Sequence, residues 1–136
     1  MRVLLDTNIV IDFLQKREPY FKDVEQIFNL CVSGEADGFI TASSCTDIYY
    51  FSRKVTKSAN KAKVIMANLF MLVGVLDTKG MDCFNALFSS MKDFEDAVIV
   101  ETASNQQIDY IVTRNLKNFK EATIEVLSPK EFIKKA

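Results

Sequence analysis

Acidic side chains occur at three separate places in the sequence from which they could bind one ion. Asp6 follows the apolar run Val3–Leu5, and Asp47 comes soon after the segment Gly38–Thr41. The third place holds three acids: Asp93, Glu95 and Asp96. Carboxylates that converge repel each other, and a divalent cation removes that repulsion. Mg²⁺ and Mn²⁺ prefer such oxygen ligands, and water activated by either ion can attack a phosphodiester.

The composition removes most other kinds of catalysis. The 136 residues include no histidine, which excludes Ser/His/Asp and Cys/His systems and zinc sites that contain histidine. The three cysteines, Cys31, Cys45 and Cys83, are an odd number without C-x-x-C spacing, so we expect buried, reduced thiols rather than disulfides. Seventeen basic against eighteen acidic residues give a net charge of -1, so any contact with nucleic acid needs a local basic patch.

Short apolar strands alternate with helices along the chain. The predicted strands are Val3–Leu5, Gly38–Thr41, Val75–Leu76, Tyr110–Val112 and Ile124–Leu127. Such alternation predicts right-handed βαβ crossovers and a parallel sheet covered on both faces. We therefore expect one α/β domain over residues 1–136, with its chemistry beyond the carboxyl ends of the strands, at Asp6, Thr41–Asp47 and Thr113–Asn118.

The helices are predicted from apolar spacing and from capping residues. Thr7 or Asn8 is expected to cap the first helix, and Ser43 or Ser44 the helix that carries Asp47. Other helices are expected from Pro19 to Gly34, along the stripe Ala62–Phe70, along Phe84, Leu87, Phe88 and Met91, from Phe94 to Ser104, and after Pro129. No apolar run approaches the roughly 20 residues that cross a membrane, and no signal peptide is visible, so we expect a cytoplasmic protein.

Each candidate residue also has a structural interpretation. Asp6 could cap the helix that follows it, and Asp93 and Asp96 have the spacing of a capping pair. Asp47 could be a solvated position beside an apolar stripe, and Thr113 could simply end a strand. These structural roles and a role in an ion site remain open alternatives at the level of sequence.

Basic and aromatic residues could contact RNA. Possible phosphate contacts are Arg53, Lys57, Arg114 and Lys117, although charged side chains in loops are usually only solvated. Arg53, Lys57 and Lys61 would form a basic stripe if their segment were one helix, but a loop at Lys57 is also possible. Tyr49 and Tyr50 could stack on unpaired bases or pack in the core or at a dimer interface.

Four segments together resemble a PIN domain, and the resemblance extends from Arg2 to about Phe132. They are Val3–Asn8 (VLLDTN), Thr46–Tyr50 (TDIYY), Asp93–Ala97 (DFEDA) and Thr113–Phe119 (TRNLKNF). The resemblance implies a three-layer α/β/α PIN-like fold with a central parallel five-stranded sheet. It also implies a nuclease that needs Mg²⁺ or Mn²⁺.

Carried over by position, the family's acidic residues match Asp6, Asp47 and Asp96. The fourth acidic position falls at Asn115 or Asn118, where this chain has amides instead of carboxylates. The resemblance therefore implies a metal and catalytic site made of Asp6, Asp47, Asp96 and Asn115. Accessory roles fall to Asp93, Glu95, Thr113 and Asn118.

The family resemblance also implies a biological role. Many relatives are VapC-type toxins of toxin-antitoxin pairs, so we expect an endoribonuclease that forms a homodimer and has an antitoxin as its partner. The two asparagines leave a second possibility open, because an amide supplies no charge to a metal site. In that alternative the chain is a catalytically impaired PIN-like protein that binds RNA or acts as a scaffold.

Overall fold

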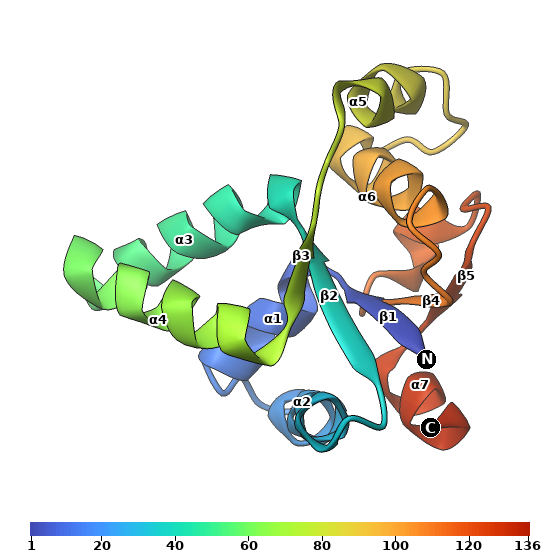
Figure 1. Cartoon of the computed structure of the whole chain (residues 1–136). Coiled ribbons are helices and arrows are strands. Elements are labelled where there is room, and N and C mark those ends of the chain that lie inside the picture. The colour runs from blue at the N-terminus through green and yellow to red at the C-terminus, as the bar shows by residue number, and fades with distance from the viewer.

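Five parallel strands form the centre of the computed structural model, which describes residues 1–136 (Figure 1). They are β1 (Arg2–Leu5), β2 (Asp37–Thr41), β3 (Gly74–Leu76), β4 (Tyr110–Val112) and β5 (Glu125–Leu127), in the spatial order β3-β2-β1-β4-β5. All neighbouring strands are parallel, so their carboxyl ends lie along one edge. The first strand of the chain is thus the central strand, and Asp6 follows it directly.

Seven α-helices and one 3-10 turn complete the fold. They are α1 (Thr7–Leu14), α2 (Phe21–Ser33), α3 (Ala42–Thr56), α4 (Ala59–Leu72), α5 (Gly80–Ala86), α6 (Phe94–Ser104), η1 (Leu116–Phe119) and α7 (Pro129–Lys135). The predicted three-layer α/β/α fold with a parallel five-stranded sheet is confirmed. None of these helices is both long and apolar enough to cross a membrane.

The two faces of β1 belong to two separate cores because side chains alternate along a strand. Val3 and Leu5 pack in one core with residues of α1, α2, α4 and α7. Leu4 lies in the other, with residues of α6 and with Phe119 of η1. Figure 1 shows α5 and α6 on one side of the sheet and α1, α2 and α7 on the other. The sheet is therefore covered on both faces, and β1 is fixed from each side.

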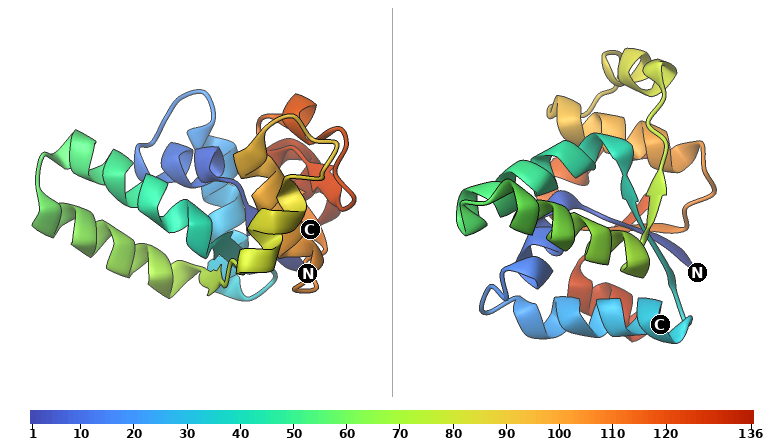
Figure 2. Two further views of the ribbon diagram at one scale, coloured as in Figure 1. Left: turned by 90° about the horizontal axis from the view of Figure 1, so that it is seen from above. Right: turned by 60° about the vertical axis from the view of Figure 1, so that its left-hand side comes forward.

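The paired helices α3 and α4 extend away from the carboxyl edge of the sheet (Figure 2). Lys57 ends α3 with a left-handed backbone (φ 56°), and Ser58 caps α4. The predicted basic stripe of Arg53, Lys57 and Lys61 is therefore interrupted by a turn. Arg53 and Lys57 are exposed at the end of α3 that is far from the sheet.

The structure selects Asp6 among the alternatives for the cap of α1 and corrects the predicted cap of α3, for the same physical reason. Asp6, not Thr7 or Asn8, caps α1, and Thr41, not Ser43 or Ser44, caps α3. A capping residue needs an extended backbone while its side chain accepts a hydrogen bond from the first turn. The residue that ends or directly follows a strand already has that backbone, with ψ values of 155° at Asp6 and 151° at Thr41. Strand and helix therefore join without an intervening loop.

The structure corrects two further predictions, the length of the helix around Phe84 and the burial of the cysteines. The helix ends at Ala86, so the predicted stripe does not continue to Met91. Leu87 and Phe88 are 67% and 76% exposed, although their spacing favoured a buried helical face. All three cysteines are free, as expected, but Cys31 and Cys45 are only partly buried and Cys83 is exposed.

Candidate active site

Asp6 lies at the carboxyl end of the central strand, where burial and capping combine. Only 5% of the residue is exposed. Its Oδ1 accepts a hydrogen bond from the Thr7 backbone at 2.8 Å, and its Oδ2 accepts bonds from Asn8 Nδ2 at 3.3 Å and Thr113 Oγ1 at 2.7 Å. Asp6 thus caps α1, and these bonds also fix the direction of its carboxylate.

The electrostatic surroundings of Asp6 oppose its negative charge. Burial raises the pKa of this carboxyl above its usual value because the charged form loses hydration. The hydrogen bonds from Thr113 and Thr7 act in the opposite direction, and the charge of Asp93 raises the pKa further. Arg114 lowers it by the smallest contribution. The carboxylate is therefore held in place by donors but lacks a close cation to balance its charge.

Asp96 stands in the first turn of α6 and faces the same group of acids. Asp93 is the N-cap of that helix, and its Oδ1 accepts the backbone N–H of Asp96 at 3.0 Å. Burial raises the pKa of Asp96 to about 6, and the charges of Asp6, Asp93 and Glu95 contribute to the increase. Hydrogen bonding by the Asn118 side chain acts against them. We call Asp6, Asp93 and Asp96 the acid cluster.

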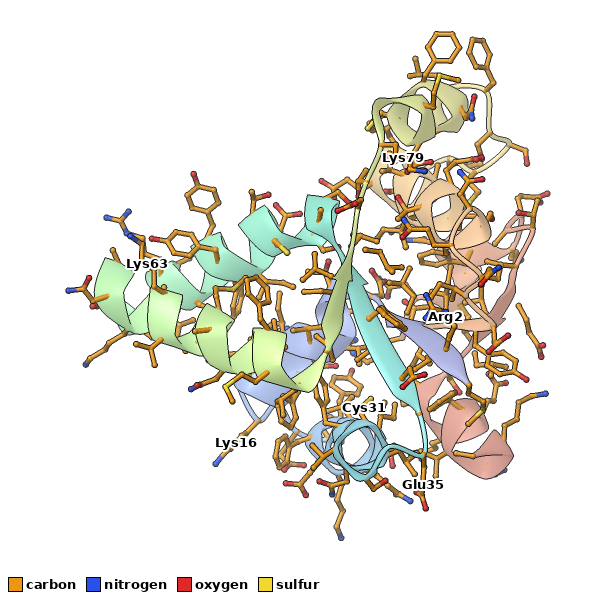
Figure 3. The ribbon with its side chains drawn as sticks, viewed as in Figure 1. Arg2, Lys16, Cys31, Glu35, Lys63 and Lys79 are labelled. Carbon is orange, nitrogen blue, oxygen red and sulfur yellow. The ribbon has the colours of Figure 1, made fainter.

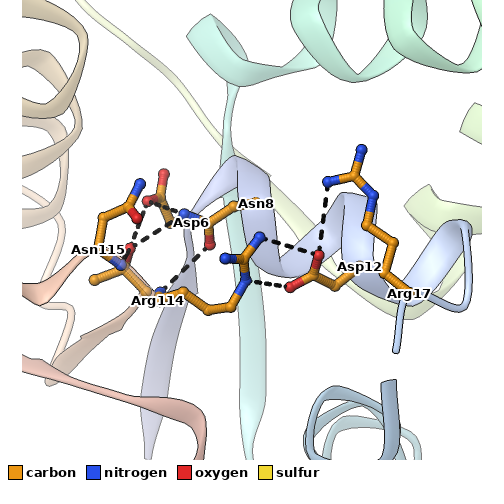
Figure 4. Close-up of polar contacts among 7 residues, drawn as sticks. Asp6, Asn8, Asp12, Arg17, Arg114 and Asn115 are labelled. Carbon is orange, nitrogen blue, oxygen red and sulfur yellow. Dashed lines mark hydrogen bonds and ion pairs between the residues drawn. The ribbon is translucent and has the colours of Figure 1, made fainter. Parts of the chain in front are cut away.

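Thr113 connects the acid cluster to the loop after β4. It is fully buried, and its hydroxyl donates to Asp6 while accepting the backbone N–H of Asn115 at 3.0 Å. Figure 4 shows Asn115 beside Asp6. Thr113 therefore orients the carboxylate, one of the two interpretations that the sequence left open. Asn115 reaches the site through this backbone contact, and its amide side chain is exposed.

An ion pair that sequence reasoning missed holds the same loop. Arg114 Nε donates to Asp12 Oδ2 at 2.6 Å, and Arg114 also lies 3.9 Å above the centre of the Tyr20 ring. Asp12 is completely buried, and Arg17 approaches it at 3.8 Å (Figure 4). Because the guanidinium is already paired with Asp12 and stacked on Tyr20, Arg114 is poorly placed for the RNA contact that the sequence suggested. The available signal was a charged residue three positions after Ile9, on the buried face of α1.

Asp47 is near the acid cluster but not part of it. It is exposed on α3 and lines a cavity of about 280 Å³ together with Thr7 and Glu95. Its charge is not among those that shift the pKa of Asp6 or Asp96. The structure therefore brings Asp6, Asp93 and Asp96 together, with Asn115 and Asn118 beside them, and leaves Asp47 across a neighbouring cavity.

The chemistry of these donors suits a hard divalent cation, but the carboxylates alone do not complete a site. No three His, Cys, Asp or Glu side chains lie close enough together to hold a metal ion. The atoms near Asp6 and Asp96 that could bind a metal are carboxylate, amide and hydroxyl oxygens. Mg²⁺ and Mn²⁺ prefer such ligands, and both ions commonly retain water. The site therefore fits an ion that is bound by two carboxylates and whose coordination shell is completed by amide oxygens and water.

Several solved structures are similar to this chain in fold. VapBC2 from Rickettsia felis, bound to a DNA fragment from its promoter, has a TM-score of 0.70 and 17% identity, covering 94% of this chain and 98% of that chain. A toxin-antitoxin complex from Klebsiella pneumoniae has a TM-score of 0.69 and 22% identity, covering 93% and 97%. VapBC-1 from nontypeable Haemophilus influenzae has a TM-score of 0.67 and 19% identity, covering 96% and 99%.

The sequence comparison gives the family. No curated protein matches the chain significantly in sequence. The model of the PIN domain, in contrast, matches residues 2–117, which include the acid cluster, Asp47, Thr113 and Asn115. The chain therefore belongs to the PIN domain family.

Proposed function

We propose that this protein is an endoribonuclease that depends on Mg²⁺ or Mn²⁺. The observation that carries the proposal is the convergence of Asp6 and Asp96. Burial raises the pKa of both carboxyls, the charge of Asp93 adds to both increases, and the charge of Asp6 further raises the pKa of Asp96. Two acids from distant parts of the chain are held together without a cation near enough to balance them. Such an arrangement is unfavourable by itself and becomes favourable when a divalent cation binds.

The residues of the site would divide the work as follows. Asp6 and Asp96 would hold the ion, and Asn115 would complete its shell through the side-chain oxygen. Asp47 and Glu95, which line the adjoining cavity, would orient water molecules or the substrate strand. Thr113 keeps Asp6 in one orientation. When bound, the ion supplies activation of water and stabilisation of the negative charge that develops on the phosphodiester.

Cleavage and metal binding test this proposal together. Purified protein is mixed with RNA and Mn²⁺, and products are resolved on denaturing gels, while calorimetry measures Mn²⁺ binding. Asp6→Asn and Asp96→Asn should each lose cleavage by at least a hundredfold and weaken Mn²⁺ binding. Glu25→Gln, which removes one exposed charge from α2, should do neither. Undiminished cleavage in both aspartate variants would remove the proposed roles.

A second candidate is a PIN domain that binds RNA or acts as a scaffold without cutting. Two observations favour it: the amides at Asn115 and Asn118, and the absence of three carboxylates close enough to hold an ion. Calorimetry again separates the candidates. No Mn²⁺ binding at millimolar concentration, with RNA still bound, would support this second function over the first.

We also propose that the chain is the toxin component of a type II toxin-antitoxin pair, active as a homodimer in the cytoplasm. The similar folds from Rickettsia felis and Haemophilus influenzae come from VapBC proteins, and the Klebsiella pneumoniae fold comes from a toxin-antitoxin complex. The three free cysteines fit a reducing compartment. Light scattering would test the dimer. Expressing the protein in bacteria would test whether it is toxic. Expressing it together with the product of the neighbouring reading frame would test whether that product suppresses the toxicity.

A further inference from the structure

The structure contains a basic cavity that shares a wall with the acid cluster. We propose that this cavity binds a backbone phosphate of the substrate strand, next to the phosphodiester that is cut. The inference rests on the proposed function, because it names the part of the RNA that the site recognises. We call it the lysine cavity, and its lining includes Lys92, Lys117 and Lys120.

The three lysines come from two segments that are distant in sequence. Lys92 lies just before α6, whereas Lys117 belongs to η1 and Lys120 follows it. The cavity has a volume of about 540 Å³, which is ample for a phosphate group with its sugar. All three lysines are exposed, and none forms an ion pair with an acidic residue. Their charges are therefore available to an anion.

The lysine cavity and the acid cluster are contiguous. Asp93 and Asn118 line the cavity, and both residues also act on Asp96. Asp93 additionally caps the helix that carries Asp96. A strand with one phosphodiester at Asp6 and Asp96 would thus have a neighbouring phosphate within the lysine cavity. Such a contact offsets the repulsion that the acids exert on an approaching polyanion.

The charge balance indicates a strand rather than a free polyphosphate. Two acids, Asp93 and Glu121, line the cavity with the three lysines, so the excess of positive charge is small. A nucleoside triphosphate usually needs a glycine-rich loop that presents backbone N–H groups, and no glycine lines this cavity. The phosphates of a nucleic-acid strand, in contrast, are commonly contacted by lysine side chains alone.

The other cations of the protein are less well placed. Arg114 is engaged by Asp12. Arg53 and Lys57 lie at the far end of α3, about 9 Å and 15 Å along the helix from Asp47 at 1.5 Å per residue. Figure 3 shows Lys63 on the adjacent α4, away from the sheet. We therefore assign the phosphate contact to the lysine cavity rather than to the basic residues of α3.

Binding measured without divalent cations tests the inference separately from cleavage. Fluorescence anisotropy with a labelled single-stranded RNA oligonucleotide, in EDTA and at several salt concentrations, gives the affinity and its salt dependence. The variant Lys92→Gln/Lys117→Gln/Lys120→Gln should bind at least tenfold more weakly at about 0.1 M salt. Its slope of log affinity against log salt should be smaller by about 0.7, the contribution of one neutralised phosphate on a single strand.

Two controls make the result specific, and the first is matched in charge to the lysine-cavity variant. Lys22→Gln/Lys61→Gln/Lys134→Gln removes three exposed lysines elsewhere, and Arg53→Gln/Lys57→Gln removes the alternative patch. Both should bind RNA within about twofold of the unmodified protein. Single-stranded DNA should lose affinity in parallel with RNA, because the two share the phosphate backbone.

Several results would overturn the inference. The first is an unchanged RNA affinity of the lysine-cavity variant. The second is an equal loss of RNA affinity in the Lys22 control, and the third is a larger loss in the Arg53 variant. A loss for RNA with none for DNA would also contradict phosphate recognition. If the unmodified protein cuts RNA while the lysine-cavity variant binds normally, the inference fails and the proposed function stands. If the unmodified protein neither binds nor cuts RNA, both fail.

Discussion

Arg114 and Asp12 form an ion pair across 102 positions of the chain, with Nε and Oδ2 2.6 Å apart. Asp12 lies on α1, and Arg114 lies in the loop that carries Thr113 and Asn115. The pair therefore joins the helix that Asp6 caps to the loop that orients Asp6. Its two members differ in surroundings, because the Asp12 side chain has no exposure and the Arg114 side chain has 25%.

This difference predicts unequal costs for the two halves of the pair. Arg114→Leu leaves a buried carboxylate with only Arg17 at 3.8 Å, and should lower the free energy of unfolding by about 3–5 kcal/mol. Asp12→Asn leaves a guanidinium that can turn toward water, and should cost less, about 1–3 kcal/mol. Urea denaturation of both variants measures the order. Equal costs, or a larger cost for Asp12→Asn, would contradict this prediction.

The hydroxyl of Thr113 is predicted to matter more than its methyl group. Thr113→Val removes the donor to Asp6 Oδ2 and should cost about 1–2 kcal/mol at pH 7. Thr113→Ser keeps the donor and should cost less than half as much. Because the lost bond favours the charged form of Asp6, the cost should decrease as the pH falls and that carboxyl is protonated. Denaturation at pH 7 and pH 4.5 provides the comparison.

The raised pKa of Asp96 predicts how stability depends on pH in the absence of divalent cations. The folded protein holds a proton on Asp96 up to about pH 6, whereas the unfolded chain loses it near the ordinary value of 3.8. The contribution of this group to stability is therefore complete below about pH 4 and is lost as the pH rises to about 6. Asp96 is partly exposed, so the loss should be only about 1–2 kcal/mol.

Denaturation in EDTA between pH 4 and pH 7 measures this effect. Asp96→Asn should remove most of this decline and be more stable than the unmodified protein at pH 7. Glu25→Gln should follow the unmodified protein throughout. A stability that rises over this pH range by the same amount in the unmodified protein and in Asp96→Asn would contradict the assignment.

Replacing the amide at position 118 should strengthen the ion site. Asn118→Asp places another carboxylate where the amide now faces Asp96, and should tighten Mn²⁺ binding roughly tenfold. The same change should destabilise the protein in EDTA, because it adds repulsion within the acid cluster. Calorimetry and denaturation in parallel give both results. Glu121→Asn is a control that should leave Mn²⁺ affinity unchanged, because Glu121 also lines the lysine cavity but its charge is not among those that shift the pKa of Asp6 or Asp96.

The sequence predicted the fold well wherever the spacing of apolar residues matches the face of the strand or helix that is buried. Apolar spacing, together with the residues that end helices, predicted three elements that the structure contains: β1, the helix α2 that ends at Gly34, and α6. The error at Leu87 and Phe88 has a different origin. Apolar spacing indicates which residues share a helical face, but it does not say whether another element is present to cover that face.

The candidate site was predicted less completely, because its main contacts join distant segments. The parallel sheet explains why Asp6 and the loop after β4 meet at one edge. Nothing local in the sequence indicates that Thr113 donates to Asp6 or that Arg114 binds Asp12. For Asp47 the motif had the opposite shortcoming. It identified the residue in the chain but not its distance from the acid cluster.

The central position of β1 has a consequence for synthesis on the ribosome. The amino-terminal strand needs β4 as a neighbour, and β4 leaves the exit tunnel only after most of the polypeptide has been made. Until then Asp6 has neither the Thr113 hydroxyl nor the carboxyl groups of α6 beside it. The acid cluster and the loop that orients Asp6 can therefore come together only when translation is nearly finished.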